Sequence, residues 1–359
     1  MAKFIAFYLP QFHPVPENDK WYGKGFTEWT NVAKGKPLFR GHYQPHIPAD
    51  LGFYDLRLRD TIVAQTELAK EYGVDGFCYW HYWFGNGRRL LEKPFQALVA
   101  DKTIDFPFSL AWANETWEKK LWDKNKKNEI IAEQLYPGKQ DYIDHFYALL
   151  DAFSDKRYIR VDGKLFFIVY RPLSCPDIDV FIKTWRELAE KEGLGGFYFV
   201  AKDFDCRDKE QLLSFGFDAI YNDTVLNIHH KLSMINKLRL KIQREIFGMP
   251  TTFKYKDAIK YMVTKDDYED NIFPLIAPNW DHSPRSGRKS LILTDCNPDI
   301  FGQVVNDAIK AIKGKSSEQQ IVMIRAWNEW GEGNHLEPDL KYGRGYLEQL
   351  KTVRQKEMV

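Results

Sequence analysis

Eight short apolar runs recur along the 359-residue chain, and segments with helical spacing lie between most of them. Apolar runs of this length without polar alternation are typical of strands buried on both faces of a parallel sheet. Strands that alternate with helices predict an α/β fold, and eight such strands predict closure into a (β/α)8, or TIM, barrel. The predicted strands are residues 3–10, 74–84, 106–111, 165–170, 196–201, 217–221, 271–277 and 321–324.

The helical segments show apolar residues at intervals of three or four positions. An open doubly wound sheet is the competing architecture. It would need a Gly-rich phosphate loop after the first strand, where this sequence reads LPQFHP. We therefore expect residues 1–359 to form a single (β/α)8 catalytic domain. The expected helices are residues 55–71, 90–101, 141–153, 178–192, 228–247, 298–313 and 346–354.

A long loop follows the first strand and runs to about residue 51. Loops of this length are usually functional or disordered, and the many aromatic residues argue against disorder. We expect an ordered loop, without secondary structure of its own, that folds over a site. Its candidate inward-facing groups are Glu28, Trp29, His42 and Gln44, and a structural plug held by Trp21 and Trp29 is the alternative.

The net charge and the cysteine spacing limit which partners and which cellular compartment are expected. The net charge is +1, which provides no global field for nucleic acid, so no nucleic-acid partner is expected. The four cysteines are widely separated and form no CxxC pair, which favours a reducing, cytoplasmic compartment unless a leader peptide has been removed. No run is long enough to span a bilayer.

Two basic segments are open to more than one interpretation. Residues 118–129 (EKKLWDKNKKNE) are best explained as a solvated surface loop, with a lid as the alternative. Residues 228–247 are basic and amphipathic, which favours a barrel helix with a solvated polar face. Peripheral contact with a membrane surface is the minority interpretation of this second segment.

Polar and aromatic residues follow the predicted strands rather than precede them, as expected for a site at the C-terminal face of a barrel. Aromatic residues make up 15% of the chain, and rings beside hydrogen-bonding groups suit the apolar faces and polar edges of sugars. Trp29, Trp83, Trp112 and Trp280 are candidate stacking platforms, and a structural role in the core is the alternative for each. The other candidate substrate-binding residues are Tyr8, Gln11, His81, Tyr82, Asn114, Glu115, Tyr170, Asn222, Asp281, Asn328, His335 and Glu337.

Residues 321–338 (IVMIRAWNEWGEGNHLEP) combine a buried strand with two tryptophans and three carboxylates. Glu329 and Glu332 are three residues apart, and neighbouring carboxylates tend to split their pKa values. Glycosidic cleavage uses such a pair, one as acid and one as base or nucleophile. Because both residues lie on one short loop, their closeness favours retention of configuration over inversion.

A catalytic metal and a cofactor are not expected. The chain contains no HExxH or HxH spacing. A site built from Glu332, His335 and Glu337 with His81 or His282 is the weaker possibility. Cys78 lies in an apolar strand and is expected to be part of the core rather than a nucleophile.

Several blocks of the sequence together resemble one family. They are FYLPQFHP, GFTEWTNV, PLFRGHYQPHIP, DLGFYDL, GVDGFCYWHYWF, LAWANETW and RAWNEWGEGNHLEPD, and they extend from Phe4 to about Tyr346. They resemble the WbsX-type glycosyltransferase family, a glycoside hydrolase family 99-like group associated with bacterial polysaccharide loci. Family 99 itself comprises (β/α)8-barrel endo-α-mannosidases and endo-α-mannanases.

The resemblance implies roles for the two glutamates. It implies that Glu329 removes the proton from the sugar 2-hydroxyl, giving a 1,2-anhydro sugar, and that Glu332 is general acid and then general base, with net retention at an α-linked sugar. The sequence departs from the family 99 pattern at Gly331, where that family has His, and at Asn334 and His335, where it has Thr and Gln. These departures concern the sugar specificity more than the chemistry.

Three functions remain open on the sequence. The first is a retaining glycosidase-like enzyme acting on an oligosaccharide or polysaccharide. The second is a glycosyltransferase of O-antigen or surface-polysaccharide biosynthesis, since the same intermediate can be opened by water or by an acceptor hydroxyl. The third is a sugar-binding protein without turnover, which would keep the aromatic residues and need no acid–base pair.

Overall fold

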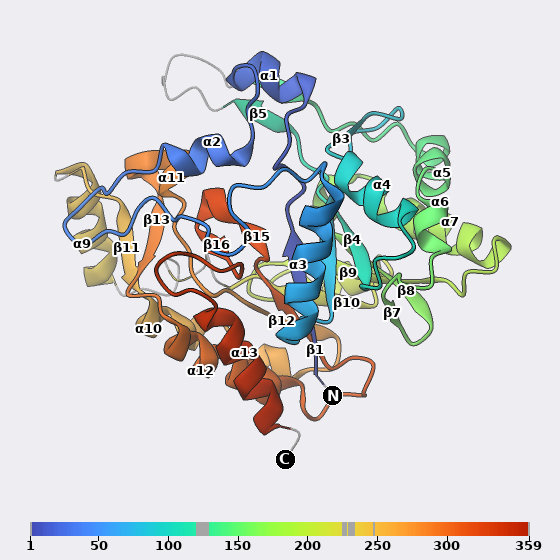
Figure 1. Ribbon diagram of the computed structural model, residues 1–359. Coiled ribbons are helices and arrows are strands. Elements are labelled where there is room, and N and C mark those ends of the chain that lie inside the picture. The colour runs from blue at the N-terminus through green and yellow to red at the C-terminus, as the bar shows by residue number, and fades with distance from the viewer. Residues whose placement is uncertain (1, 120–128, 225–227, 229–233, 247, 358–359) are drawn as a thin grey trace.

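Eight parallel strands form a closed barrel in the computed structural model, which describes residues 2–119, 129–224, 228, 234–246 and 248–357 (Figure 1). Strand β1 pairs with both β2 and β14, so the ring closes: Ile5 lies opposite Gly76 on one side and Met323 on the other. All eight predicted strands are confirmed. They are β1 (Lys3–Tyr8), β2 (Gly76–Trp83), β4 (Phe108–Trp112), β8 (Lys164–Val169), β9 (Phe197–Asp203), β10 (Ala219–Asn222), β12 (Ile272–Ile276) and β14 (Ile321–Ile324).

Helices surround the barrel, as predicted for a (β/α)8 fold (Figure 1). In α7, for example, Phe181, Ile182 and Trp185 are buried, at the spacing of one helical face. The predicted helix 141–153 is interrupted, because Leu149 has a non-helical backbone (φ −115, ψ 2). The outer helices are α3 (Arg59–Glu71), α4 (Lys93–Ala100), α5 (Lys139–Tyr147), α6 (Leu150–Phe153), α7 (Ile178–Lys191), α8 (Lys209–Ser214), α12 (Pro298–Ile312) and α13 (Gly345–Lys356).

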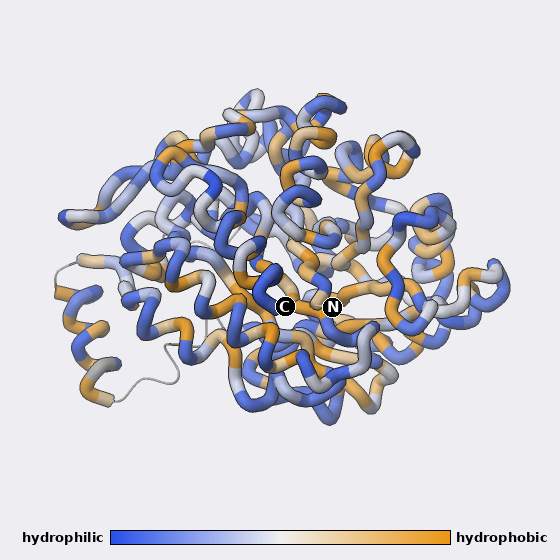
Figure 2. Tube along the Cα trace, turned by 60° about the horizontal axis from the view of Figure 1, so that its bottom comes forward, coloured by the Kyte–Doolittle hydropathy of each residue, from blue (hydrophilic) through white to orange (hydrophobic). Residues whose placement is uncertain are grey.

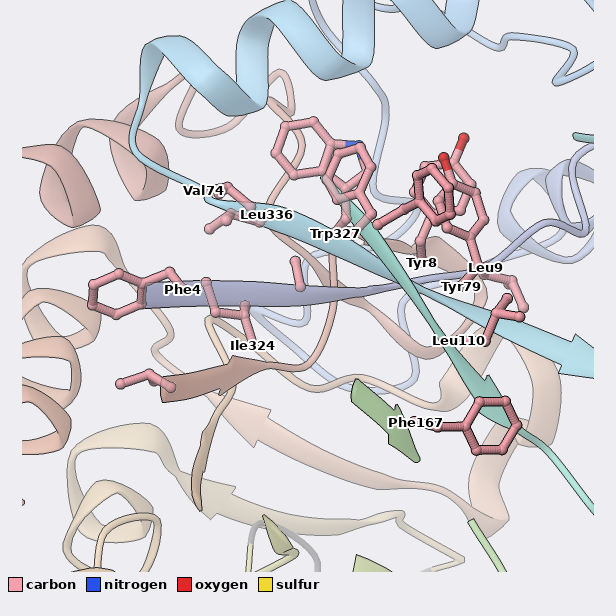
Figure 3. Close-up of a cluster of buried hydrophobic side chains, with 14 of the residues drawn as sticks. Phe4, Tyr8, Leu9, Val74, Tyr79, Leu110, Phe167, Ile324, Trp327 and Leu336 are labelled. Atoms are coloured by element: carbon pink, nitrogen blue, oxygen red, sulfur yellow. The ribbon is translucent and has the colours of Figure 1, made fainter. Parts of the chain in front are cut away.

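The strands separate two apolar layers because successive side chains point to opposite faces of a sheet. Phe4, Ala6 and Tyr8 of β1 belong to the layer between strands and helices. Ile5 and Phe7 belong to the layer inside the barrel, which also contains Cys78, as expected for a core cysteine. Figure 3 shows part of the outer layer, in which Phe4 lies at one side of the view, Tyr8 and Tyr79 lie at the other, and Trp327 lies between them.

The loop after β1 contains two short helices, which corrects the expectation of a loop without secondary structure. Helix α1 (Pro16–Tyr22) begins at a proline in the first turn, and α2 (Glu28–Ala33) has a capping box formed by Thr27 and Thr30. Trp29 packs on Phe12 and Tyr54, so the loop is held by aromatic contacts. It runs over the C-terminal end of the barrel (Figure 1).

Smaller elements decorate the barrel after the other strands. Hairpin β5 (Trp117–Lys119) and β6 (Glu129–Ala132) flanks residues 120–128, so most of the predicted basic loop lies outside the described residues. Strand β11 (Thr251–Lys254) pairs in parallel with β13 (Leu291–Thr294). The others are β3 (Arg89–Leu90), β7 (Arg160–Val161), α9 (Met234–Glu245), α10 (Tyr255–Ala258), α11 (Ser283–Ser286), β15 (Asn328–Glu329), β16 (Asn334–His335) and the 3-10 helices η1 (Pro172–Ser174), η3 (Ile259–Tyr261), η4 (Lys265–Tyr268), η5 (Gly287–Lys289) and η6 (Trp330–Glu332).

Helix α9 corrects the interpretation of residues 228–247, of which the structure describes residues 228 and 234–246. A barrel helix with a solvated polar face was expected. Instead the apolar side of α9 is exposed, and Met234 and Ile235 are each 80% exposed. Among the described residues, no helix has the length and apolarity needed to cross a membrane.

Candidate active site

A cleft of about 600 Å³ lies at the C-terminal ends of the barrel strands. Its lining comes from the ends of β1, β2, β4, β8 and β14 and from α1, α2 and α11. Both Glu329 and Glu332 line it, as the rule for barrel sites leads one to expect. Its aromatic lining includes Trp80, Tyr82 and Trp117.

A tight turn after β14 positions the two glutamates. The side chain of Asn328 clamps the backbone of Leu9, accepting from its N–H at 2.7 Å and donating to its carbonyl at 3.0 Å. Strand β15 then pairs with β16, and η6 closes the turn between them. Gly333 has φ 56, and a Cβ there would lie 2.9 Å from backbone atoms of Asp281, so a side chain would not fit. The turn therefore holds Glu329 and Glu332 side by side.

Arg285 of α11 connects three carboxylates in the cleft. Its Nε donates to Glu28 Oε2 at 3.0 Å, its Nη2 to Glu329 Oε2 at 3.3 Å and its Nη1 to Glu332 Oε1 at 2.5 Å. A Cβ on Gly331 would lie 2.1 Å from Glu28 Oε2 and 3.0 Å from Arg285 Nε. The absence of a side chain at Gly331 thus leaves the room in which this ion pair sits.

The environments of the two glutamates separate their pKa values. Burial raises the pKa of Glu329 to about 8, and the neighbouring charge of Glu332 acts in the same direction. Burial opposes ionisation of Glu332 too, but the charge of Arg285 and a hydrogen bond from His282 prevail and hold its pKa below the usual range. These opposite directions favour a protonated Glu329 beside an ionised Glu332 at neutral pH.

The cleft brings together part of the predicted site. Gln11, Glu28, Tyr82, Glu115 and Tyr170 line it with the two glutamates. Other lining residues were not predicted to bind substrate, namely Trp80, Trp117, Arg285, Arg325 and His282, the last of which was considered only as a metal ligand. Arg325 directly follows the last predicted strand, and Trp117 and His282 follow the third and the seventh, so their positions after strands were the available signal in the sequence. Arg285 lies in SPRSGRKS, which carries no catalytic pattern.

The predicted stacking platforms Trp83, Trp112 and Trp280 belong to the apolar core, and only 3%, 1% and 4% of their respective surfaces are exposed. Stacking on a sugar needs an exposed ring face, so this expectation is corrected. Trp83 Nε1 donates to Asp141 at 2.9 Å, and Trp112 Nε1 to the carbonyl of Trp83 at 3.0 Å. His81 is buried too, and its Nε2 is 2.8 Å from Nε2 of His145.

Four other predicted residues hold the loops over the cleft. Asp281 accepts hydrogen bonds from Gln44 Nε2 at 2.6 Å and from the backbone N–H of Ser283 at 2.9 Å, and lies 2.7 Å from His42 Nε2. Trp29 Nε1 donates to the carbonyl of Tyr54 at 2.7 Å. None of Trp29, His42, Gln44 and Asp281 is among the residues that line the cleft. Their contacts fix the loop after β1 to the element that carries Arg285.

Glu337 and Tyr8 belong to a buried network behind Trp330. Glu337 accepts hydrogen bonds from Tyr54 at 2.9 Å, Gln65 at 2.6 Å and Trp330 Nε1 at 2.6 Å, and Gln65 accepts from Tyr8 at 2.6 Å. Burial raises the pKa of Glu337 to about 7. This network positions the turn that carries the catalytic candidates.

The side chains of Asn114 and Asn222, both predicted to bind substrate, make contacts within the protein instead. Asn114 accepts from the backbone N–H of Arg171 at 2.7 Å and donates to its carbonyl at 2.8 Å. Asn222 is fully buried, with its Nδ2 3.4 Å from Thr264 Oγ1. Neither lines the cleft.

His335 lies outside the cleft, with its ring stacked 3.6 Å from that of Trp330. Its Nε2 is 3.0 Å from His46 Nδ1 and 3.8 Å from Asp339 Oδ2. In the described part of the chain these three residues are the one group with metal-ligating atoms within 4.8 Å of one another. The two ring nitrogens lie at hydrogen-bond distance and pair as donor and acceptor without an ion.

Comparison with known proteins gives a family model and two curated relatives. The model described as "Glycosyltransferase WbsX" matches residues 4–350. Over 356 residues the chain is 35% identical to proteins called "Uncharacterized protein WxcX" from two strains of Xanthomonas campestris pv. campestris. Each match covers 98% of this chain and 49% of the relative, so the chain spans about half the length of the curated relatives it matches.

Solved structures share the fold. A glycoside hydrolase family 99 endo-alpha-mannosidase from Bacteroides thetaiotaomicron, in complex with Bis-Tris propane, superposes with a TM-score of 0.60 and 12% identity over 99% of this chain and 98% of its own. A "Glycoside hydrolase-like protein" gives a TM-score of 0.58 and 15% identity over 98% and 93%. At these identities the likeness shows the fold, and it agrees with the predicted barrel.

Proposed function

The chain belongs to the WbsX glycosyltransferase family, and from that premise we propose that it is a carbohydrate-active enzyme that acts with retention at α-glycosidic bonds. One observation carries the proposal: Glu329 and Glu332 lie side by side in a cleft of about 600 Å³ and share Arg285, and their pKa values are shifted in opposite directions. A pair with separated pKa values is the requirement of glycosyl chemistry.

The proposed reaction has two steps and uses protein side chains alone. Glu329 removes the proton from the sugar 2-hydroxyl, and that oxygen attacks the anomeric carbon while Glu332 protonates the departing glycosidic oxygen. The product of this step is a 1,2-anhydro sugar. Glu332 then deprotonates the incoming hydroxyl that opens the ring at the anomeric carbon, and Glu329 returns the proton to the sugar oxygen. Two inversions give retention.

The single proton has to move before the first step. The raised pKa of Glu329 favours the proton there, whereas the reactive arrangement needs it on Glu332. Both arrangements hold the same number of protons, so no exchange with solvent is needed. A sugar hydroxyl that donates to Glu329 stabilises its ionised form and moves the proton toward Glu332.

Transfer is the second candidate outcome, and the description of the matching family favours it. Water and an acceptor hydroxyl open the same intermediate, so the two outcomes share Glu329 and Glu332. With an acceptor saccharide the enzyme would extend a surface polysaccharide such as an O-antigen. Product analysis by mass and anomeric NMR, with and without acceptor saccharide, separates hydrolysis from transfer.

The test compares Glu329→Gln and Glu332→Gln on α-linked substrates with poor and good leaving groups. Loss of general acid–base catalysis lowers turnover about 10²–10⁴-fold. Glu332→Gln should recover most of its kcat/KM on an aryl glycoside with an acidic phenol, because that leaving group needs no proton and kcat/KM covers the steps up to its departure. Glu329→Gln should stay slow on both substrates, because the internal nucleophile still needs a base.

Glu318→Gln is the matched control, since this glutamate pairs with Lys3 at the surface and lies outside the cleft lining. It should leave turnover unchanged. Unchanged turnover in both cleft variants would refute the proposal. If the acidic leaving group restored the activity of Glu329→Gln rather than that of Glu332→Gln, Glu329 would be the general acid and Glu332 the base for the 2-hydroxyl. Sugar binding without turnover in the native chain would establish the binding-protein alternative.

A further inference from the structure

The apolar side of α9 faces away from the rest of the molecule. Met234 and Ile235 are each 80% exposed, Leu238 is 59% exposed and Ile242 is 41% exposed. Ile246 is 72% exposed and continues the same stripe, since its N–H donates to the carbonyl of Ile242 at 2.9 Å. Figure 2 shows orange segments along this helix at the edge of the molecule. Contiguous exposed apolar surface of this kind marks an interaction site.

The opposite side of α9 holds the helix to the protein. Successive residues of a helix are rotated by about 100°, which places Leu240 and Gln243 away from the stripe, and both are partly buried. Gln243 Nε2 donates to the carbonyl of Pro250 at 3.0 Å and to Thr252 Oγ1 at 3.3 Å. A polar anchor on the body side and an apolar stripe on the outer side reverse the usual orientation of a surface helix.

Positive charge accompanies the stripe. The helix carries four basic residues and one acidic residue, Glu245, whereas the whole chain has a net charge of only +1. Arg239 and Lys241 are exposed beside the apolar stripe, one on each flank. The other basic residues are Lys237 and Arg244, the latter 3.5 Å from Glu245.

We propose that α9 lies in the headgroup region of an anionic lipid bilayer, parallel to its surface, and attaches the protein peripherally. An apolar stripe flanked by Lys and Arg is the combination that binds such surfaces: the stripe is buried at the acyl boundary and the basic residues contact anionic headgroups. A protein partner would also cover an apolar stripe, but the basic flanks on both sides favour a uniformly anionic plane.

The attachment helix connects to the cleft through a short series of contacts. Gln243 bonds to Thr252 of β11, and Thr252 lies opposite Ile292 of β13. Ile292 bridges to Asp281, which precedes the short helix that carries Arg285. The lipid surface would therefore lie beside the side of the cleft from which Arg285 projects.

Vesicle co-sedimentation of the full chain tests this inference. The probes are vesicles of phosphatidylcholine alone and of equal parts phosphatidylcholine and phosphatidylglycerol. The native chain should bind the anionic vesicles, less so as salt is raised, and bind the neutral ones weakly. The double change Leu238→Ser and Ile242→Ser should weaken binding at least about tenfold. Arg239→Gln and Lys241→Gln should each weaken it about fivefold.

Matched controls make the same chemical changes elsewhere. Leu58→Ser and Leu340→Ser alter leucines that are 59% and 67% exposed, and Lys156→Gln and Lys183→Gln alter exposed lysines near α6 and in α7. None should affect vesicle binding. Failure of the native chain to bind anionic vesicles would overturn the proposal. So would equal losses in the controls, or a stripe variant that changes only the self-association of the protein, which would identify a protein interface.

Discussion

At the scale of residues, the cleft is governed by one proton shared between Glu329 and Glu332. The proposed reaction needs that proton, whichever glutamate carries it at the moment of reaction. Burial and the charge of Glu332 raise the pKa of Glu329 to about 8. The pair loses its last proton as the pH rises through this value. Titration therefore belongs to the pair, and a pH profile reports the pair rather than either member.

We expect kcat/KM to fall as pH rises through about 8, because kcat/KM reports ionisation of the free enzyme and the pair is then empty of protons. Initial rates from pH 6 to pH 10 on an α-linked substrate measure this limb. Circular dichroism over the same range separates ionisation from unfolding. A profile that stays flat while the fold is intact would contradict the shared proton.

The site could be predicted only where chemistry leaves a local pattern. Glu329 and Glu332 stand in one turn after a strand, so their spacing is visible in the sequence. Arg285 reaches them from a polar segment more than forty residues earlier, and only the fold shows that meeting. Trp83 and Trp112 stand beside polar residues in the sequence, but their indole N–H groups bond to Asp141 and to the carbonyl of Trp83, which only the fold brings near them.

At the scale of elements, strands were predicted well because burial on both faces leaves an uninterrupted apolar run. The break between α5 and α6 was not visible, since both sides of it keep helical spacing. The apolar stripe of α9 was visible in the sequence. A hydrophobic pattern does not tell whether such a stripe packs against the protein or faces away from it. Gln243 decides that orientation through contacts with β11.

Helix α12 offers a test of how capping supports the barrel. Asn297 is its N-cap and accepts from the N–H of Ile300 at 3.0 Å. Asn297→Ala should lower the free energy of unfolding by about 1 kcal/mol, because one N–H of the first turn loses its partner. Denaturant titration measures the change. Asn297→Ser keeps a capping oxygen and should restore most of it, and equal loss in both variants would contradict a capping role.

At the scale of the whole molecule, a buried ionic group ties three strands together at the C-terminal end of the barrel. Asp223, fully buried after β10, lies 3.1 Å from Lys202 of β9 and 2.8 Å from Arg325, which follows β14. Burial opposes the charge on Asp223, but the two cations prevail and hold its pKa below the usual range. The barrel therefore depends on this carboxylate remaining ionised.

Asp223→Asn should cost about 3–5 kcal/mol of unfolding free energy at neutral pH, because it leaves the buried Lys202 and the partly buried Arg325 without their counter-ion. The deficit should shrink in acid, since the native protein loses the same charge once pH falls through the lowered pKa of Asp223. Chemical denaturation at several pH values measures both effects. Asp50→Asn, at the exposed pair with Arg344, is the control and should cost no more than about 1 kcal/mol. Equal losses would show that the buried group is not special.

The closure of the barrel through β1 makes the order of the strands circular, because neighbouring strands follow one another along the chain and the last strand pairs with the first. Strand β1 bonds to β2 on one side and to β14 on the other, so the ring has no edge strand at which it must begin. The last turn of α13 lies beside the start of β1, where the guanidinium of Arg354 is 5.9 Å from the ring of Phe4. A circular permutant, with these neighbouring ends joined and the chain opened in a surface loop, would keep every strand between the same two partners.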